Sequence, residues 1–316
     1  MAISIGIIGA GGIVKRRHLP GFREIPDCRV VAVQNRRRAN AEAVAREWDI
    51  PHVVERPEQV YGRDDVNVVL VGTTPYLHRD LTVAALQAGK HVFCQARMAR
   101  NLAEAREMLA AAQAHPELVT MVCPAPRVDP VDRYVRRVLR EGELGEIRLV
   151  RVQHLSGGFA DPETPLHWRM EREVSGSQIH TLGQYVEILH RWFEPAVSVT
   201  AWGKVFFAER RHPESGAAVR VTIPESLVAT GELKNGAQFV YTFATVLPHG
   251  GDERIEIYGS KGSLIYTPAD EVLRLGAGAV PEKVEVPAEF RTPWSVEADF
   301  VAAIREGKPS PVDPDG

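Results

Sequence analysis

The sequence has little of what marks secreted, metal-binding or membrane proteins. Three of its 316 residues are cysteine, Cys28, Cys94 and Cys123, an odd number without the spacing of a metal site. We expect reduced thiols in a cytoplasmic protein and no metal centre. No apolar run is long enough for a membrane span, and Met1–Ile8 lacks the basic segment and long apolar stretch of a signal peptide.

The sequence also lacks a surplus of charge of either sign. It has 38 Lys and Arg against 41 Asp and Glu, so its formal net charge is −3. No broad basic field is present to attract nucleic acid or a membrane surface. The hydrophobic content of 44% and charged content of 25% are ordinary for a soluble enzyme, and the length suits two domains with separate cores.

Residues 1–122 alternate between short β-branched runs and helical patterns. The expected strands are 3–8, 30–34, 66–71, 91–94 and 120–122. Between them, apolar residues such as Leu102, Ala105 and Leu109 recur at the three-and-four spacing of a helix face. This alternation predicts an α/β Rossmann domain with a parallel sheet over residues 1–122.

The pattern changes after residue 122. A helix is expected over 131–140, a strand over 147–154, and a series of longer strands between 197 and 286. Asn235-Gly236 is typical of a tight hairpin turn, and a last helix pattern covers 296–304. We therefore predict that residues 123–316 form an α+β domain with a large open antiparallel sheet, which serves the substrate and oligomerisation.

The strongest single motif is the glycine-rich turn Gly9-Ala10-Gly11-Gly12-Ile13-Val14, between a strand and a helix. Gly9 permits a tight turn, and Gly11 allows a pyrophosphate to approach the backbone, with Gly12 and Ile13 beside it. The motif predicts a dinucleotide site. Val14 occupies the third position, where Gly or Ala is usual, which predicts a helix slightly further from the strand.

The end of the second strand bears on the choice of cofactor. A site selective for NAD(H) would carry an acidic residue there, but this chain has Asn35 followed by Arg36. Without the acid, a 2′-phosphate is not repelled, and the Arg36 guanidinium can bind it in bidentate fashion. NADP(H) is therefore favoured over NAD(H).

Several longer segments resemble the glucose-fructose oxidoreductase / inositol dehydrogenase (Gfo/Idh/MocA) family. They are GAGGIVKRRHLPGF (9–22), VGTTPYLHRDLTVAALQAGKHVFC (71–94), REGELGEI (140–147), YGSKGSL (258–264) and FVAAIREGKPSPV (300–312). The resemblance implies a nicotinamide cofactor, substrates that are sugars, cyclitols or their derivatives, and dimers or tetramers formed through the open sheet face.

The resemblance also implies roles for individual residues. Thr73, Thr74, Pro75 and His78 match a loop that lies along the dinucleotide, with Gln95 at the end of the next strand. Arg127 matches the segment entering the second domain, near the substrate.

The family's proton-handling residues are replaced in this chain. Where the family has Glu-Lys-Pro, this chain reads Gln95-Ala96-Arg97, so alanine stands at the lysine position. The family's Asp and His, four residues apart on a helix, are matched by Thr181 and Tyr185. Hydride transfer at a carbinol nevertheless needs a group that exchanges the hydroxyl proton.

Two hypotheses remain open. In the first, the chain is an oxidoreductase with a relocated proton-transfer set: His180 and Tyr185 are catalytic candidates and Glu187 can enter the same cleft. Arg97 can hold a carboxylate or oxyanion, and Trp168 and Arg169 can form an aromatic and cationic substrate platform, which favours an acidic substrate. His154 and His167 are weaker candidates because no spacing groups them.

In the second hypothesis, the chain is a catalytically inactive dinucleotide-binding protein, either a sensor or a partner subunit. The simultaneous loss of the lysine, aspartate and histidine favours it. The polar replacements at residues 95, 97, 180 and 185 count against it.

Overall fold

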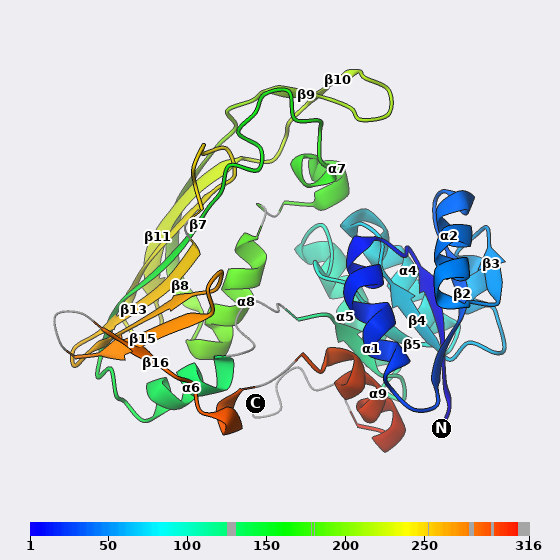
Figure 1. Cartoon of the computed structure of the whole chain (residues 1–316), viewed down its shortest axis with the longest axis horizontal. Helices are drawn as coiled ribbons and strands as arrows, with labels where there is room; N and C mark the ends of the chain where they lie inside the picture. The colour runs from blue at the N-terminus through cyan, green and yellow to red at the C-terminus, as the bar shows by residue number, and fades with distance from the viewer. Residues whose placement is uncertain are drawn as a thin grey trace. The chain divides into compact units, whose positions relative to one another are not determined.

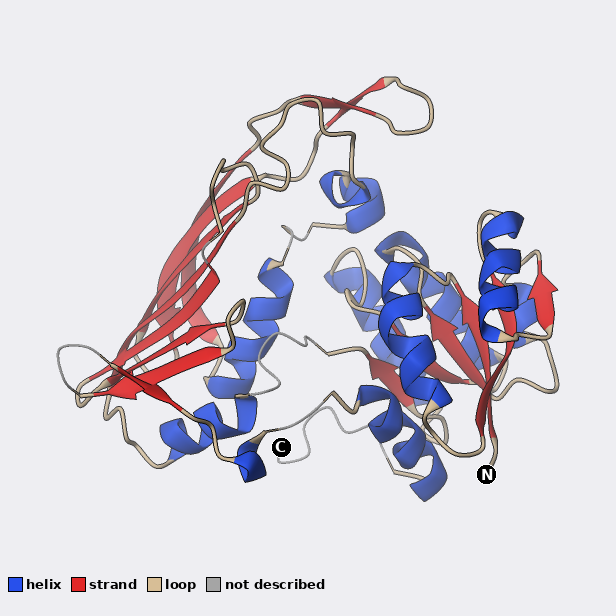
Figure 2. Cartoon of the chain, viewed as in Figure 1, coloured by secondary structure: helices blue, strands red, loops and turns tan. Residues whose placement is uncertain are grey.

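A computed structural model describes residues 1–124, 131–177, 179, 181–251, 253–277, 281–291 and 294–308. The chain divides into two compact units, seen in Figures 1 and 2. Unit 1 comprises Met1–Pro124, Glu173–Gly176 and Ser295–Gly316, and unit 2 comprises Ala125–Arg172 and Ser177–Trp294. Unit 1 thus includes a short segment and a terminal stretch that the sequence pattern alone assigns to the second domain.

The core of unit 1 is a six-stranded parallel sheet with the order β3-β2-β1-β4-β5-β6. Its strands are β1 (Ile3–Ile8), β2 (Cys28–Gln34), β3 (His52–Val54), β4 (Val68–Val71), β5 (His91–Cys94) and β6 (Thr120–Val122). β1 and β4 are buried along their whole length, as expected for a parallel sheet covered on both faces. The predicted Rossmann architecture is confirmed.

Alternate residues of β5 show how the two faces of this sheet are covered. Phe93 makes edge-to-face contacts with Phe22 and Phe300, at centroid distances of 5.9 and 5.4 Å. Val92 and Cys94 belong to the buried cluster on the opposite face. The first face is covered by α1 (Leu19–Arg23) and α9 (Val296–Glu306), and the second by α4 (His78–Gln87) and α5 (Leu102–Ala114). The remaining helices of the strand-helix alternation are α2 (Arg38–Trp48) and α3 (Glu58–Tyr61).

Unit 2 contains an eight-stranded sheet with the order β16-β15-β14-β13-β7-β12-β11-β8. These strands are β7 (Ile147–Leu155), β8 (Ala196–Lys204), β11 (Ser226–Leu233), β12 (Gln238–Ala244), β13 (Glu253–Gly259), β14 (Ser263–Thr267), β15 (Val272–Gly276) and β16 (Glu282–Val284). β9 (Glu209–Arg211) and β10 (Ala218–Arg220) form a separate ribbon. Among the described strand pairs of the large sheet, β7 and β12 are parallel and the others antiparallel, so the predicted antiparallel sheet is mixed at one pair.

Two helices cover one face of this sheet, as Figure 2 shows: α6 (Asp132–Arg140) and α8 (Leu182–Trp192). Their apolar residues pack into one buried cluster with inward-facing residues of the strands. The other face keeps apolar side chains in solvent, including Trp202, 78% exposed, beside Val228, 49% exposed. The Asn235-Gly236 turn joins β11 to β12 as predicted, with φ +86° at Gly236.

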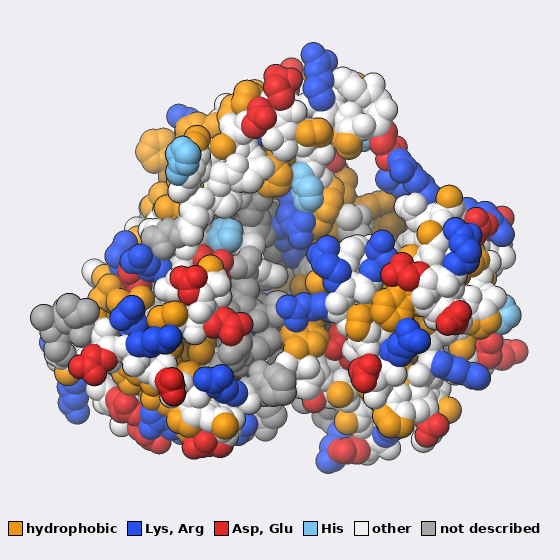
Figure 3. All heavy atoms as spheres, in the orientation of Figure 1, with side chains coloured by type: hydrophobic (Ala, Val, Ile, Leu, Met, Phe, Trp, Pro, Cys, Tyr) orange, Lys and Arg blue, Asp and Glu red, His pale blue; other side chains and the backbone are white. Residues whose placement is uncertain are grey.

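On the surface drawn in Figure 3, charged side chains of both signs are interspersed, in keeping with a net charge of −3. Among the described helices, none has the length and apolar character needed to cross a membrane.

Candidate active site

Four loops of unit 1 begin where parallel strands end. Gly9 follows β1, Asn35 follows β2, Gly72 follows β4 and Gln95 follows β5. The carboxyl ends of parallel strands lie at one edge of the sheet, and β1 and β4 are the neighbours between which the strand order reverses. This edge is where sheets of this type bind dinucleotides.

The glycine turn is shaped by close contact between two of these loops. Gly9 has φ +86°, and a Cβ atom there would lie 2.7 to 2.9 Å from atoms of Gly72 and Thr73. A Cβ atom at Gly72 would lie 2.4 Å from the Gly9 oxygen and 2.5 Å from Val14 Cγ2. Gly72 thus leaves room for the bulky Val14. Gly11, by contrast, faces open space, with the Gly72 oxygen 3.9 Å from its Cβ position.

Asn35 carries an unused donor beside this turn. The Ala10 N–H donates to Asn35 Oδ1 at 2.7 Å, which fixes the orientation of the amide. The Asn35 Nδ2 atom is buried and has no hydrogen-bond partner among the described atoms. A buried amide N–H without an acceptor is costly, so this position fits a ligand oxygen. Ribose oxygens occupy it in dinucleotide-binding sheets.

The cations near this edge differ in their surroundings. Arg36 is exposed directly after Asn35. Arg38 forms ion pairs with Glu42 at 2.9 Å and Glu55 at 2.8 Å. The Arg16 guanidinium, which the sequence analysis did not select, lies 3.2 Å from the Cβ position of Gly12. Arg16 is four residues after Gly12, so its position one helical turn beyond the last glycine was the signal that could have identified it.

His78 is a buried support of the Thr73–Thr74 loop. Its Nδ1 lies 2.7 Å from the Arg97 oxygen and its Nε2 lies 3.1 Å from the Thr73 oxygen. Burial opposes its charge, but the Cys94 sulfur and the two carbonyl oxygens favour it, and the pKa of His78 is raised to about 9. His78 therefore holds the Thr73–Thr74 loop in place through hydrogen bonds to the backbone carbonyl oxygens of Thr73 and Arg97. Pro75 begins the short helical turn between Thr74 and His78.

The Gln95 side chain is held by two residues that sequence reasoning missed. His18 Nε2 lies 2.7 Å from Gln95 Oε1, and His18 Nδ1 lies 2.5 Å from Glu297 Oε1. His18 is fully buried and Glu297 is 2% exposed. His18 ends the helical segment Val14–His18, directly before α1, whereas Gln95 follows a strand and Glu297 lies on the last helix, so no local spacing joins the three residues.

Arg97 is directed to another part of unit 1. Its Nη1 donates to Ser175 Oγ and lies 3.4 Å from the Ser175 oxygen. At Gly176, a Cβ atom would lie 2.2 Å from the Arg100 oxygen, so only glycine fits there. The predicted carboxylate-binding role of Arg97 is untested, but its guanidinium has this structural partner.

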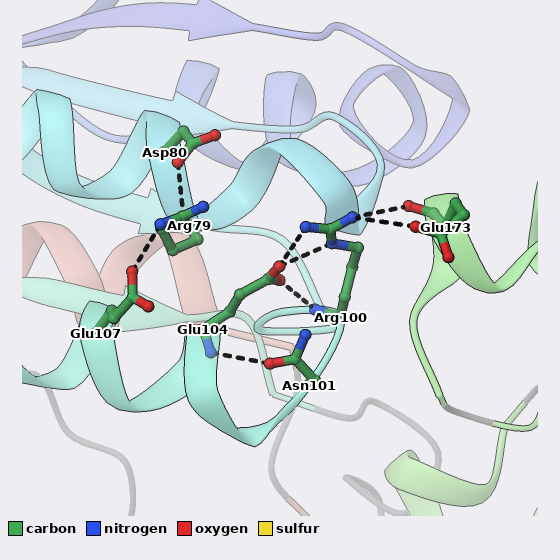
Figure 4. Close-up of polar contacts among 7 residues, drawn as sticks. All are labelled: Arg79, Asp80, Arg100, Asn101, Glu104, Glu107 and Glu173. Atoms are coloured by element: carbon green, nitrogen blue, oxygen red, sulfur yellow. Dashed lines mark hydrogen bonds and ion pairs between the residues drawn. The ribbon is translucent and has the colours of Figure 1, made fainter.

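Figure 4 shows how Glu173, two residues before Ser175, is joined to Arg100, and how Arg100 and Arg79 are paired with carboxylates. Arg100 pairs with Glu104 at 2.5 Å and donates to the Glu173 oxygen at 3.2 Å. Asn101 accepts from the Glu104 N–H at 3.0 Å and thereby caps α5. Arg79 pairs with Asp80 and Glu107, both at 2.7 Å. Helix α7 (Arg172–Ser175) is thus tied to the start of α5.

In unit 2, Trp168 and Arg169, the candidate substrate platform, stack on each other. The Arg169 guanidinium carbon lies 4.3 Å from the Trp168 ring centroid, and the Arg169 N–H donates to His167 Nδ1 at 3.2 Å. Burial lowers the pKa of Arg169 below its usual value. Among the described residues, no carboxylate forms an ion pair with Arg169.

The loop before Trp168 is anchored by a buried ion pair. Arg210 and Glu225 both have side chains with no exposed surface, and their charged atoms lie 3.2 Å apart. Arg210 also donates to the carbonyl oxygens of residues 159, 161 and 164 at 2.6 to 3.0 Å. The approach to Trp168 is therefore fixed by one buried guanidinium.

A second polar cluster of unit 2 joins Tyr185, Glu253 and His154. The Tyr185 hydroxyl donates to Glu253 Oε1, and His154 Nδ1 lies 3.7 Å from Glu253 Oε2. Phe243 contacts both rings, at 5.4 Å from Tyr185 and 6.3 Å from His154. Tyr185 has no exposed surface, so it cannot meet a substrate directly. Its partner Glu253 gave no sequence signal, because it lies 68 residues away on another strand.

The other predicted residues are distributed as follows. Glu187 pairs with Arg191 at 3.6 Å along α8. The Thr181 hydroxyl is buried without a hydrogen-bond partner among the described atoms. His180 and Arg127 lie outside the described residues. Within the part of the chain that the structure describes, no cluster of His, Cys, Asp or Glu could hold a metal ion.

Comparisons with known proteins agree with this architecture. Residues 3–122 match the model of an oxidoreductase family with an NAD-binding Rossmann fold, and residues 133–265 match the GFO/IDH/MocA C-terminal domain. A parallel-sheet dinucleotide unit joined to a mixed-sheet unit defines a class of two-domain oxidoreductases. Within that class, the chain belongs to the Gfo/Idh/MocA family.

Two relatives and one solved structure illustrate the match. The chain is 26% identical to an uncharacterised oxidoreductase from Synechocystis sp., covering 98% of this chain and 84% of that protein. It is 28% identical to levoglucosan dehydrogenase from Pseudarthrobacter phenanthrenivorans, covering 84% and 73%. A structure of levoglucosan dehydrogenase in complex with NADH and L-sorbose covers 99% of this chain and 92% of that one, with a TM-score of 0.86 and 23% identity.

Proposed function

We propose that the protein is an oxidoreductase that prefers NADP(H) and acts on a sugar, cyclitol or sugar acid. The observation that carries this proposal is Asn35, whose buried Nδ2 has no partner among the described atoms at the end of β2. An amide there can donate to the ribose or to its 2′-phosphate, whereas an acid would repel the phosphate. Arg36 follows directly and adds a positive charge.

The residues at the strand ends fit the cofactor. Gly9 permits the tight turn, and Gly11 leaves room for the pyrophosphate. Arg16 lies beside Gly12 of the turn, and Thr73, Thr74 and Pro75 form the neighbouring loop. When bound, the nicotinamide supplies hydride transfer. The residues of unit 1 bind and orient it, and the proton must be exchanged by other groups.

Cofactor choice is tested by one substitution. Asn35→Asp should weaken NADPH binding at least about 10-fold relative to NADH, because the new carboxylate repels the 2′-phosphate. Asn40→Asp, an exposed change of the same charge on α2, is the matched control. The measurement is a fluorescence titration of both reduced cofactors. Equal effects of the two variants, or tighter NADH binding by the unmodified protein, would refute the NADP(H) preference.

An acidic substrate is the second part of the proposal. Arg169 is largely buried on the Trp168 ring and lacks a carboxylate partner among the described residues. A desolvated guanidinium of this kind can bind a substrate carboxylate. In a panel of neutral sugars, cyclitols and sugar acids, Arg169→Gln should raise KM about 10-fold or more for acids and leave neutral substrates unchanged. Equal effects on both groups would exclude a carboxylate-binding role.

A catalytically inactive dinucleotide-binding protein is the second candidate function. It is favoured by Ala96, Thr181 and Tyr185, which stand where the family resemblance places the lysine, aspartate and histidine. The same panel separates the two functions. Tight cofactor binding without oxidation or reduction of any panel member would count against the enzyme and favour the inactive dinucleotide-binding protein.

The open face of the large sheet is proposed to bind a second copy of the chain. Trp202 and Val228 are cross-strand neighbours on β8 and β11, and both are exposed. Exposed apolar patches of this kind mark interaction surfaces, and the family resemblance implies dimers or tetramers. Light scattering of the purified protein measures the oligomeric state directly. A monomer at micromolar concentration would contradict the proposal.

A further inference from the structure

Gln95, at the end of β5, has its side-chain oxygen directed at a buried histidine. Its N–H donates to the Val71 oxygen at 2.9 Å, so Gln95 continues the line of the strand. Side chains alternate along a strand, which places Gln95 on the same face of the sheet as Phe93, two residues earlier. His18 lies on that face, with its ring 5.0 Å from the Phe93 ring and its Nε2 2.7 Å from Gln95 Oε1.

A buried carboxylate holds this histidine at the other ring nitrogen. Glu297 Oε1 lies 2.5 Å from His18 Nδ1. The carboxylate is lodged against α1, which packs on α9 (Figure 1), and a Cβ atom at Gly21 would lie 2.8 Å from Glu297 Cδ. Gln95, His18 and Glu297 all belong to unit 1. The cluster is therefore built within the unit that is proposed to hold the cofactor.

The contacts of the His18 ring decide which way the Gln95 amide points. An amide oxygen accepts hydrogen bonds and cannot donate, so His18 Nε2 must carry a proton for Gln95 Oε1 to face it. Glu297 Oε1 faces Nδ1, and a second proton lies between those two atoms. The other end of the amide, Gln95 Nε2, is then turned away from His18 with its N–H groups outward.

Gln95 Nε2 is accessible at the edge of the sheet. None of the described residues accepts a hydrogen bond from it, and it is not one of the buried side-chain atoms that lack a partner, so it is in contact with solvent. In sheets of this strand order, β1 to β3 form one mononucleotide-binding half and β4 to β6 the other. Asn35 follows β2 in the first half, whereas Gln95 follows β5 in the second.

We propose that His18 and Glu297 are positioning residues that hold the Gln95 amide with Nε2 toward the cofactor, where it donates to an oxygen of the nicotinamide nucleoside. This inference rests on the proposed dinucleotide-binding function. The acceptor oxygen belongs to the second ribose or to the carboxamide, and the ligands of the first test distinguish the two.

The replacement of glutamate by glutamine explains why a positioning device is needed. Where the family resemblance places a glutamate, this chain has Gln95. The two oxygens of an ionised carboxylate are both acceptors, so turning the group over changes nothing. The two ends of an amide differ, because one accepts and the other donates. A protonated His18 Nε2 makes one orientation favourable and leaves a fixed donor for the cofactor.

The first test compares calorimetric titrations of the whole protein with NADPH and with 2′,5′-ADP, which lacks the nicotinamide nucleoside. Gln95→Met should raise the Kd for NADPH about 5- to 10-fold and leave that for 2′,5′-ADP within about twofold. Gln87→Met, at an exposed position on α4, is the matched control. An NADPH Kd within about twofold of the parent value, or equal weakening of both ligands, would overturn the proposal.

A third ligand identifies the acceptor. The 2′-phosphate of ADP-ribose keeps the second ribose and lacks the nicotinamide. If Gln95→Met weakens this ligand as much as NADPH, the acceptor is a ribose hydroxyl, and if it weakens NADPH alone, the acceptor is the carboxamide oxygen.

The positioning role is tested by two substitutions of His18. His18→Leu should weaken NADPH as Gln95→Met does, because nothing then orients the amide. His18→Gln, which can still donate to Gln95 Oε1 from its own amide, should keep the Kd within about threefold. His52→Gln, at an exposed position on β3, is the control. A purely structural role of His18 would weaken NADPH and 2′,5′-ADP by the same factor, which would contradict the assignment.

A further measurement needs no cofactor. Nitrogen-15 NMR of labelled histidine should show His18 Nε2 protonated in the free protein, and an unprotonated Nε2 would overturn the inference. A parent protein that binds neither NADPH nor NADH would overturn the proposed function and this inference together. Binding that is insensitive to Gln95→Met would overturn the inference alone. If the parent prefers NADH, the same comparison is made with NADH and ADP.

Discussion

In unit 1, the residues proposed to hold the cofactor come from four loops at one edge of a parallel sheet. Much of the proposed binding relies on backbone groups and on glycines that lack a side chain. In unit 2, the cluster of His154, Tyr185 and Glu253 consists of side chains from a strand, a helix and another strand. The first arrangement is repeated wherever such a sheet binds a dinucleotide, because it needs glycine and strand ends. The second depends on individual side chains and can change while the fold persists.

The largest expected effect concerns the buried ion pair that anchors the loop before Trp168. Arg210→Met should lower the free energy of unfolding by about 3–5 kcal/mol, because it leaves the buried Glu225 carboxylate without its cation, with the N–H groups of Phe206 and Phe207 as its remaining partners. Urea unfolding measures the change, with Arg220→Met, an exposed arginine on β10, as the control. If unit 1 is independent of this anchor, the folded variant should still bind NADPH. A loss below 1 kcal/mol would show that the pair contributes little.

The second-largest expected effect is on cofactor binding by unit 1. Gly11→Ala should weaken NADPH binding at least about 100-fold, or about 2.7 kcal/mol, because a methyl group occupies the approach of the pyrophosphate. Stability should be unchanged, since the Gly72 oxygen is 3.9 Å from the new Cβ and is the one described atom within 4 Å. Gly158→Ala, with no neighbour within 4 Å among the described atoms, is the control. Unchanged binding by Gly11→Ala would contradict the placement of the cofactor.

The smallest effect concerns His78. Its pKa is raised to about 9 in the folded protein, above the ordinary value of 6.5, so its stabilising contribution is present below pH 6.5 and is lost as the pH rises through 9. Between pH 7 and pH 10, the parent protein should lose about 2–3 kcal/mol of unfolding free energy from this group. His78→Gln should show a correspondingly flatter pH profile. Parallel profiles would indicate an uncharged His78.

The same contrast explains what could be predicted from sequence. The parallel sheet and the glycine turn follow from local periodicity and from motifs a few residues long, and the role proposed for Asn35 rests on the same kind of motif. The contact of Tyr185 with Glu253 does not, because it joins residues 68 positions apart through strand register and helix packing. Gly72 was likewise unpredictable as the glycine that makes room for Val14. Tertiary contacts of this kind leave no periodic signal in the chain.

Arg97 marks the limit of reasoning from residue type. Its charge and its place in the family motif suggested an anion-binding role, whereas the structure pairs its guanidinium with Ser175. Chemistry alone does not say which acceptor a guanidinium meets. Arg169, selected on similar grounds, lies on the ring of its sequence neighbour Trp168, and its role toward a substrate stays a prediction.

The packing of α9 on unit 1 has a consequence for synthesis. His18 is buried against Glu297, 279 residues later in the chain, and Phe300 covers Phe93 of the central sheet. A ribosome-bound chain that has released residues 1–124 therefore still exposes one face of its first sheet and lacks the carboxylate for His18. Because α9 is translated after the residues of unit 2, the N-terminal unit can be completed only after unit 2 has been made. The first domain to be translated is thus among the last parts of the molecule to be completed.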